Sequence, residues 1–265
     1  MAKQLPRQID GLKQQILFVG TLVEEAIAKA ISALINRDLN LANAVIRSDE
    51  EIDRMEVDVE EEVLKILALY QPVAADLRFV VAVLKINNDL ERMGDLATNI
   101  AKRAVFLSNC ERYDLPLDFK GMATRAQSMV KQSLDALVKS DPMLAQKVRD
   151  SDDEVDALRK IIETQIEQQI AQHPDRADCL IRLSSVARHL ERIADMATNI
   201  AEDVIYMVEG EIVRHHRASE SRLMPAAGRV STTAPPIGLR RAPSGPIRNG
   251  YPSRRAGSSM SSSPR

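Results

Sequence analysis

Residues 90–101 read LERMGDLATNIA, and nearly the same stretch, LERIADMATNIA, returns at residues 190–201. The two copies share nine of their twelve residues. In each copy a Glu, an Asp and an Asn follow one another at intervals of four residues. At 3.6 residues per turn, this spacing places the three side chains on one stripe of an α-helix. The chain is therefore expected to contain a duplicated helix with a row of oxygen donors: Glu91, Asp95 and Asn99 in the first copy, and Glu191, Asp195 and Asn199 in the second.

The opposite stripe of this helix is apolar and should face a core. Aromatic residues make up only 3% of the 265 residues and Trp is absent, so the core must be built from aliphatic side chains. Cores of this kind suit helix bundles. The sequence therefore predicts an all-α protein. The core residues expected in the first copy are Leu90, Met93, Ala97, Ile100, Ala101 and Ala104.

Proline and polar residues divide the chain into two halves with the same plan of three helices. Gln71-Pro72 should end one helix, and Asp141-Pro142 is typical of an N-cap followed by the first helical residue. Another break is expected around Pro116. The predicted units span residues 1–112 and 113–217. Their predicted helices are 8–36, 41–70 and 74–107, then 118–139, 142–172 and 174–215.

Residues 218–265 differ sharply from the rest of the chain. They hold seven Pro, five Gly, ten Ser and eight Arg, with Glu220 as their single acid, and carry a net charge of +7. Such a segment buries too little apolar surface to offset its chain entropy, so we expect a disordered basic tail. The alternative is a docking arm for an acidic partner, nucleic acid or lipid.

The remainder of the chain is acidic and shows no membrane span. Residues 1–217 carry a net charge of −9, which makes nucleic-acid binding by this part unlikely. No apolar run approaches the ~20 residues that cross a bilayer, and MAKQLPRQID at the N-terminus lacks the apolar segment of a secretory signal. Cys110 and Cys179 fit no zinc or redox spacing and are interpreted as incidental thiols. We expect a cytoplasmic protein.

Two further acidic pairs follow the duplication. Asp49 and Asp53 lie four residues apart in one predicted helix, and Asp152 and Asp156 occupy the same places 103 residues later. If each of these helices packs against the motif helix of its own half, the pairs can face one another. Like charges at this spacing cost a helix roughly 0.2–0.5 kcal/mol per pair.

A bound cation would remove this conflict of charge. Carboxylate and amide oxygens suit hard or borderline cations, so the sequence predicts a site for divalent or trivalent metal ions, with iron, manganese, magnesium or zinc as candidates. The alternative is that these acids form the solvated face of amphipathic helices. The neighbouring Thr98, Thr198, Arg92 and Arg192 are expected to be structural, and His189, His215 and His216 to lie at the surface or between helices.

The paired acidic helices, with QPVAADLRFVVAVLKINND at residues 71–89, resemble the PhoU family of bacterial phosphate regulators. The resemblance covers about residues 5–216 and both repeats. It implies two pseudo-symmetric three-helix bundles and metal clusters on Glu91, Asp95, Glu191 and Asp195, and the earlier Asp pairs match the family's preceding acidic helices. The tail departs from the family pattern.

The resemblance also implies a non-enzymatic role and a set of partners. It predicts a cytoplasmic homodimer or larger assembly that acts on the phosphate ABC transporter, including its ATPase subunit, and on the phosphate-sensing histidine kinase. In this role the protein restrains uptake and starvation signalling when phosphate is plentiful. Nucleic acid is an unlikely partner.

Two other functions remain open from the residues alone. One is a helical adaptor without metal. The other is a di-metal carboxylate enzyme of the ferritin-like kind, which calls for Glu-x-x-His on two helices. None of the four His residues has a Glu three residues before it, so this second alternative is disfavoured.

Overall fold

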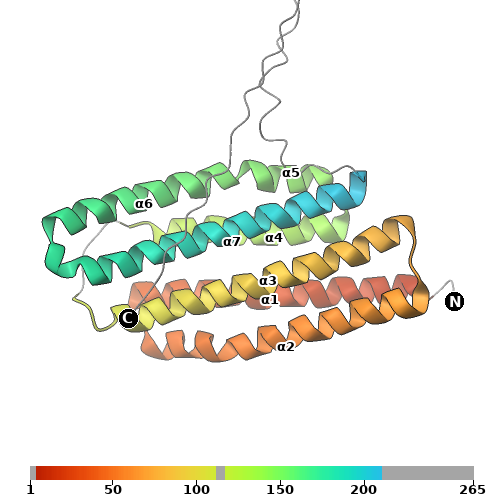
Figure 1. Ribbon diagram of the computed structural model, residues 1–265, viewed down its shortest axis with the longest axis horizontal. Helices are drawn as coiled ribbons and strands as arrows, with labels where there is room; N and C mark the ends of the chain where they lie inside the picture. The colour runs from red at the N-terminus through yellow and green to blue at the C-terminus, as the bar shows by residue number, and fades with distance from the viewer. Residues whose placement is uncertain (1–3, 112–116, 211–265) are drawn as a thin grey trace, which may run out of the picture. The chain divides into compact units, whose positions relative to one another are not determined.

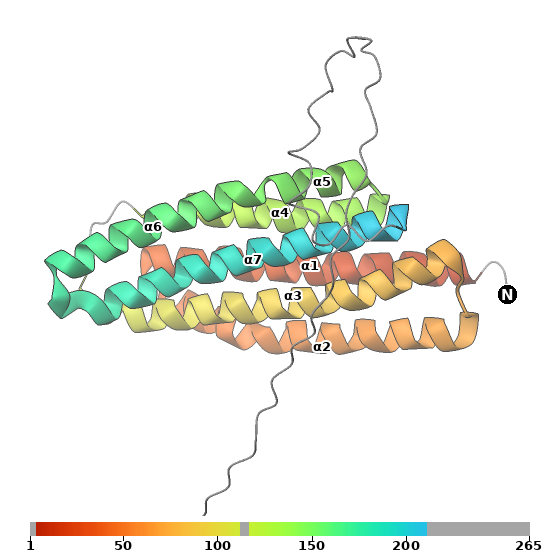
Figure 2. The ribbon, with the colours of Figure 1, turned by 45° about the horizontal axis from the view of Figure 1, so that its top comes forward.

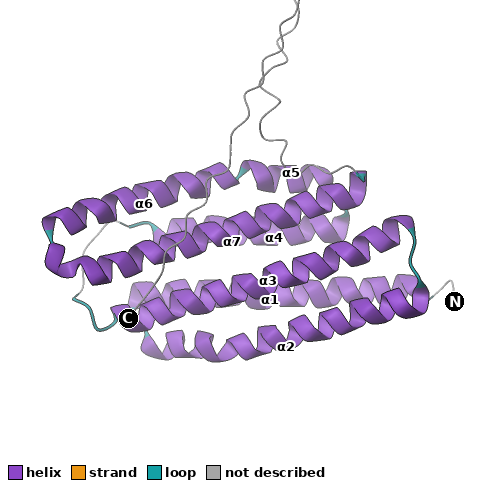
Figure 3. Ribbon diagram, in the orientation of Figure 1, coloured by secondary structure: helices purple, strands orange, loops and turns teal. Residues whose placement is uncertain are grey.

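The computed structural model describes residues 4–111 and 117–210, and in these ranges every regular element is a helix (Figure 3). The all-α prediction is therefore confirmed. The predicted tail, Pro116 and the boundary between residues 112 and 113 lie outside the described residues. The first half contains α1 (Leu5–Asn36), α2 (Leu39–Tyr70) and α3 (Ala74–Leu107). The second contains α4 (Phe119–Lys139), α5 (Pro142–Asp150), α6 (Asp152–Gln172), the short 3₁₀ helix η1 (Pro174–Arg176) and α7 (Ala177–Glu209).

Short polar side chains begin several of these helices, and the cap at Asp141 is the one that the sequence predicts. Asp38 accepts hydrogen bonds from the backbone amides of residues 40 and 41 and so caps α2. Asp141 does the same for residues 143 and 144 at the start of α5, with Pro142 as the first helical residue. Arg37, with φ of 55°, ends α1 in the left-handed conformation. Local capping and turn conformations thus set these boundaries.

The helix predicted over residues 142–172 is interrupted, which corrects the sequence interpretation. Ser151 separates α5 from α6: its hydroxyl donates to the carbonyl of Lys147 and its amide bonds to the carbonyl of Val148. Such side-chain bonds to the backbone compete with regular helix. Three acids in the first turn of α6 favour a new helix start, since negative charge is stabilised at an N-terminus. The last predicted helix begins at Ala177, after η1, and its predicted end at 215 lies outside the described residues.

The helices of each half lie side by side, and the halves meet along α3 and α7 (Figures 1 and 2). Lys85 of α3 pairs with Asp203 of α7, and Arg103 bonds to Ser185, so the two helices run antiparallel. The midpoint of these pairings falls at residues 94 and 194, which are equivalent positions of the repeat. The duplication is therefore expressed as an approximate twofold relation between two bundles.

The apolar stripe of the motif helix is buried as predicted. Leu90, Met93 and Ile100 have no exposed surface, and neither do their counterparts in α7. Full burial of side chains this large contributes about 1.5–3 kcal/mol each. The six core residues predicted for the first copy are all buried: Leu90, Met93, Ala97, Ile100, Ala101 and Ala104.

A glycine in the motif lets α2 approach α3 closely. A Cβ atom placed on Gly94 would lie 3.1 Å from Cδ1 of Ile52, a buried residue of α2. Ile52 lies one residue before Asp53 and three after Asp49. The close approach at Gly94 therefore brings the acidic pair of α2 beside the acidic row of α3.

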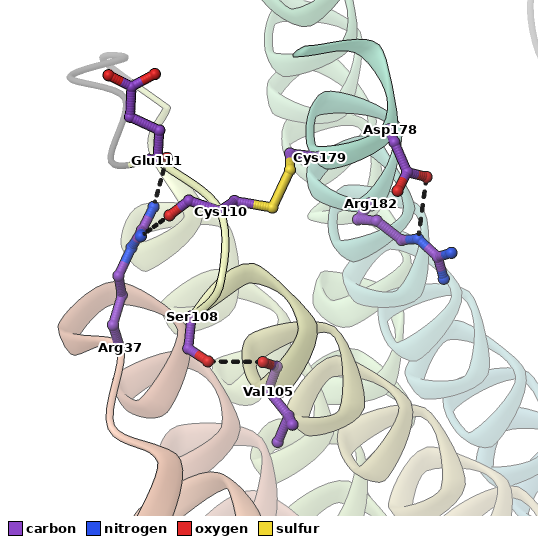
Figure 4. The surroundings of a disulfide bond; sticks show 8 residues. All are labelled: Arg37, Val105, Ser108, Cys110, Glu111, Asp178, Cys179 and Arg182. Carbon is purple, nitrogen blue, oxygen red and sulfur yellow. Dashed lines mark hydrogen bonds and ion pairs between the residues drawn. A yellow bond between two sulfur atoms is a disulfide. The ribbon is translucent and has the colours of Figure 1, made fainter. Parts of the chain in front are cut away.

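The two cysteines form a disulfide, so their interpretation as incidental thiols was wrong (Figure 4). Cys110 follows the end of α3 and Cys179 lies near the start of α7, with their Cα atoms 6.4 Å apart. Arg37 fixes the Cys110 segment by donating to the carbonyls of Cys110 and Glu111. A separation of 69 residues matches no spacing motif, because the pairing is created by the packing of the two halves.

Among the helices described, none is long and apolar enough to cross a membrane.

Breaking the disulfide should lower stability. Closing a loop of this length in the unfolded chain accounts for a stabilisation on the order of 4 kcal/mol in the loop-entropy description. We expect the Cys110→Ser/Cys179→Ser variant to unfold at a lower urea concentration than the oxidised wild type. Its free energy of unfolding should be lower by up to this amount. A reducing agent should lower the wild-type midpoint and leave the variant unchanged. Equal midpoints for oxidised wild type and variant would contradict the stabilising role.

Candidate metal site

In the first half, the acids of α2 and α3 lie close enough to influence one another. Burial raises the pKa of Asp49, and the neighbouring carboxylates Asp53 and Asp95 raise it further. The pKa of Glu91 is likewise raised by burial and then by Asp95, Asp53 and Glu56. The acidic pair of α2 therefore faces the acidic row of α3. We call Asp49, Asp53, Glu56, Glu91 and Asp95 the first acidic face.

The second half repeats this arrangement on α6 and α7. Burial raises the pKa of Glu191, and the carboxylates of Asp156, Glu163 and Asp152 raise it further, while Arg159 opposes them. Asp152 is itself buried. We call Asp152, Asp156, Glu163, Glu191 and Asp195 the second acidic face.

A buried threonine anchors the leading Asp of each face. Thr198 of α7 donates from Oγ1 to Oδ1 of Asp152 over 3.4 Å, and Thr98 of α3 hydrogen-bonds to Asp49. Both threonines thus bond a neighbouring helix, one of the two structural roles expected for them; the sequence did not indicate which residue they bond. Each threonine follows the motif Asp of its own copy by three residues, and this repeated spacing is the sequence signal that both have the same role.

The two faces differ at one position that sequence reasoning missed. In the second face, Nη1 of Arg159 lies 2.5 Å from Oε2 of Glu163, and its Nε lies 3.4 Å from Oε1 of Glu191. The offset of 103 residues assigns Glu56 to the same position of the first face. One face thus has an internal cation where the other has a further carboxylate.

Both faces border a cleft between the halves, which is lined by Glu56 of the first face and by Asp152 and Asp195 of the second. The cleft has a volume of ≈1110 Å³ and contains side chains from α2, α3, α5, α6 and α7. Most of its charged residues are acids, against the two cations Lys85 and Arg149. Among the predicted site residues, Asp152, Asp195 and Asn199 line it, whereas Asn99 is partly buried elsewhere on α3.

The acids are gathered on two faces without forming a compact cluster. Within residues 4–111 and 117–210, no three His, Cys, Asp or Glu side chains are grouped so that they could hold a metal ion as they stand. The donor types nevertheless suit a hard cation. Binding an ion would require the carboxylates of one face to move toward one another.

An oxygen atom beside the first face lacks a hydrogen bond, which fits a cation there. Asn87 lies one turn before Glu91 and is 1% exposed. Its Nδ2 donates to the backbone carbonyl of Glu56 over 2.8 Å, while its Oδ1 has no hydrogen-bond partner among the described residues. A buried acceptor left unsatisfied costs about 1–3 kcal/mol, and a bound cation or its hydration shell would satisfy it. The first face therefore fits the metal that the resemblance implies.

A histidine in α7 is held neutral among arginines. Burial, followed by the charges of Arg103, Arg192 and Arg188, lowers the pKa of His189 to about 4. Neither ring nitrogen has a hydrogen-bond partner among the described residues. His189 is thus an interhelical residue, one of the two places predicted for it. His215 and His216 lie outside the described residues.

Comparisons with known proteins match the whole helical part of the chain. The PhoU domain matches twice, at residues 16–104 and 119–204. A phosphate-specific transport system accessory protein PhoU homolog from Aquifex aeolicus is 41% identical over 217 residues, covering 82% of this chain and 98% of that protein. The homolog from Pseudomonas aeruginosa is 36% identical over 218 residues, covering 81% of this chain and 89% of that protein.

Solved structures show the same fold. The crystal structure of PhoU from Pseudomonas aeruginosa matches with a TM-score of 0.74 and 35% identity, over 78% of this chain and 99% of that one. The phosphate transport system regulatory protein PhoU from Streptococcus pneumoniae matches with a TM-score of 0.71 and 28% identity, over 79% and 99% of the two chains.

The fold and the acidic faces define a duplicated helical-bundle protein with one carboxylate face in each repeat. Both repeats match the same domain over more than half of the chain, and relatives above 30% identity are covered almost completely. The chain belongs to the PhoU family.

Removing the charge of Asp49 should stabilise the metal-free protein at neutral pH. Because its pKa is raised, the folded state holds this proton more tightly than the unfolded chain, so stability falls as pH rises from 3.8 through the raised pKa. Asp49→Asn never ionises and keeps an acceptor for Thr98. We expect a gain of at least about 0.2–0.5 kcal/mol at pH 7, the value of one like-charge pair, that disappears below pH 3.8.

Urea unfolding with a chelator present, at pH 7 and at pH 3.5, measures this difference. Asp58→Asn, an exposed acid of the same helix, is the control and should change little. A destabilised Asp49→Asn at pH 7 would show that the negative charge has a stabilising partner.

The imidazole of His189 should stay neutral well below the usual range. Its folded pKa of about 4 lies below the unfolded value of 6.5, so the unfolded chain binds this proton first and stability is lost as pH falls from 6.5 to 4. Ring-proton NMR signals of His189, assigned by their loss in His189→Gln, should not shift between pH 7.5 and about 5.5. A midpoint near 6.5 would contradict the buried, neutral state.

Proposed function

We propose that this chain is a regulatory accessory protein of phosphate uptake that acts by binding and not by catalysis. The observation that carries the proposal is the match of both repeats to PhoU domains. Relatives that share nearly their full length with this chain are named as accessory proteins of the phosphate-specific transport system. A related solved structure is titled a phosphate transport system regulatory protein.

The finer role we propose is negative. When phosphate is plentiful, the protein restrains uptake through the ATPase subunit of the phosphate ABC transporter and restrains signalling through the phosphate-sensing histidine kinase. It does so in the cytoplasm as a homodimer. The net charge of −9 over residues 1–217 supports partner surfaces that are basic, because like charge across an interface disfavours association.

Metal binding on the acidic faces is part of the proposal. The residues that would hold an ion are Asp49, Asp53, Glu91 and Asp95, with Asn99 one turn further along α3, and Asp152, Asp156, Glu191 and Asp195, with Asn199, in the second half. A bound cation supplies positive charge between facing carboxylates. With their charge neutralised, the facing carboxylates would hold α2 and α3 together through the shared cation instead of repelling one another.

A cell-based experiment tests the regulatory role. Deleting the gene should raise expression of a phosphate-starvation reporter severalfold in phosphate-rich medium, and the wild-type gene should restore repression. Asp95→Asn/Asp195→Asn should fold but fail to restore it, because one acid is lost from each face. The matched control is Asp10→Asn/Asp178→Asn, which changes one exposed Asp in each half and should restore repression fully.

Two outcomes would contradict different parts of this proposal. An unchanged reporter after deletion would remove the regulatory role. Full repression by Asp95→Asn/Asp195→Asn would leave the regulatory role in place and favour the helical adaptor that works without metal.

A further inference from the structure

The two acidic faces are equivalent in the fold but not in their charge. The offset of 103 residues aligns α2 with α6, and it superimposes buried positions on buried positions: Ile52 on Val155, Val59 on Ile162 and Val63 on Ile166. Glu60 then corresponds to Glu163, and Glu56 corresponds to Arg159. One difference in charge therefore lies at the position of Glu56 and Arg159, beside the motif helix. Another lies on the motif helices, where Lys102 of α3 corresponds to Glu202 of α7.

The second face carries its own cation. The Arg159 guanidinium lies within 4 Å of two carboxylates, those of Glu163 on its own helix and Glu191 on α7. The side chains of Arg159, Glu163 and Glu191 are each only about a quarter exposed or less. The guanidinium therefore lies between α6 and α7 beside Glu191, one of the proposed ligands, and its positive charge repels a cation there.

At the position of Arg159 the first face carries a negative charge, and the cations that act on this face, Lys102 and Arg92, both lie on α3. Glu56 adds a fifth carboxylate there, and the coulombic effect of Glu56 on Glu91 shows that the two carboxylates are near neighbours. Asn87 contributes a buried Oδ1 that has no hydrogen-bond partner among the described residues. Its Nδ2 is fixed on the carbonyl of Glu56, so an exchange of the two amide atoms would place two acceptors together. The corresponding residue of the second half is Ala187, which offers no oxygen.

We propose that the two repeats divide the work: the first acidic face is the cation site, and Arg159 replaces the metal ion in the second. Glu56 and Asn87 set the preference of the first face for a divalent cation, and Arg159 excludes it from the second. This inference rests on the metal binding proposed above and restricts it: of the two ligand sets named there, only the set of the first half holds the ion, and Arg159 pairs with the acids of the second.

Exchanging the two deciding residues tests the division. The probe is Mn²⁺, added by equilibrium dialysis to full-length protein stripped with EDTA, and the readout is bound Mn²⁺ per chain by elemental analysis. Compared with the wild type, the Glu91→Gln/Asp95→Asn variant should lose most of the bound Mn²⁺, and the Glu191→Gln/Asp195→Asn variant should lose little. Glu56→Arg should weaken binding at least about tenfold, because it brings a positive charge among the first-face carboxylates.

The reverse exchange should create a second site. Arg159→Glu should raise bound Mn²⁺ to about twice the wild-type amount, and the added Mn²⁺ should disappear when Glu191→Gln/Asp195→Asn is combined with it. Circular dichroism confirms that each variant is helical. If Glu56→Arg does not fold, Glu56→Gln removes only the charge and should still weaken binding.

Matched controls separate the local effect from net charge. Glu25→Arg and Arg7→Glu carry the same charge changes at exposed positions of α1, and both should bind Mn²⁺ like the wild type. Equal loss of Mn²⁺ from the two paired-acid variants, or no gain in Arg159→Glu, would overturn the division while leaving metal binding intact. A wild type that binds no Mn²⁺ would overturn metal binding itself, and the division with it.

Discussion

The antiparallel contact between α3 and α7 is the interaction on which the rest of the structure depends. Each of these helices packs against its own bundle and also against its counterpart, so most of its circumference is apolar. Small residues of the two helices, Ala97, Ala101, Ala197 and Ala201, are fully buried, which allows neighbouring helices to pack closely. Only one stripe of each helix is left for polar groups, and the acids of the motif lie on it.

This arrangement separates folding from binding within one helix. The apolar stripe supplies the free energy that holds the bundle together, while the acidic stripe opposes folding through burial and like-charge repulsion. Raised pKa values at Asp49, Glu91 and Glu191 are the direct sign of that opposition. Such groups are common at functional sites, which agrees with the binding role proposed above.

Much of the fold could be predicted from the sequence because its signals are local. Helical periodicity identified the buried stripe, and Asp141-Pro142 marked a helix start. The break at Ser151 was missed because an acidic, helix-favouring sequence continues on both sides of it. The equivalence of Glu56 and Arg159 could have been found by applying the repeat offset to the whole acidic helix, and not only to its Asp pairs.

What could not be predicted depends on the register between helices. The hydrogen bond between Asn87 and the Glu56 carbonyl and the pairing of Cys110 with Cys179 join residues far apart in the chain. No local pattern specifies these contacts, because they follow from how far one helix slides along another. The acids of each face could be named in advance, whereas the atoms beside them could not.

The Cys110–Cys179 bond also changes the connectivity of the molecule. It turns the second half's α4, α5 and α6 into a covalent macrocycle, closed at one end by the peptide backbone and at the other by sulfur. A protease that cut the linker between the repeats would open this ring without releasing either repeat from the other. The two bundles would separate only after a reducing thiol had also broken the disulfide. Two different covalent links, a peptide bond and a disulfide, therefore hold them together.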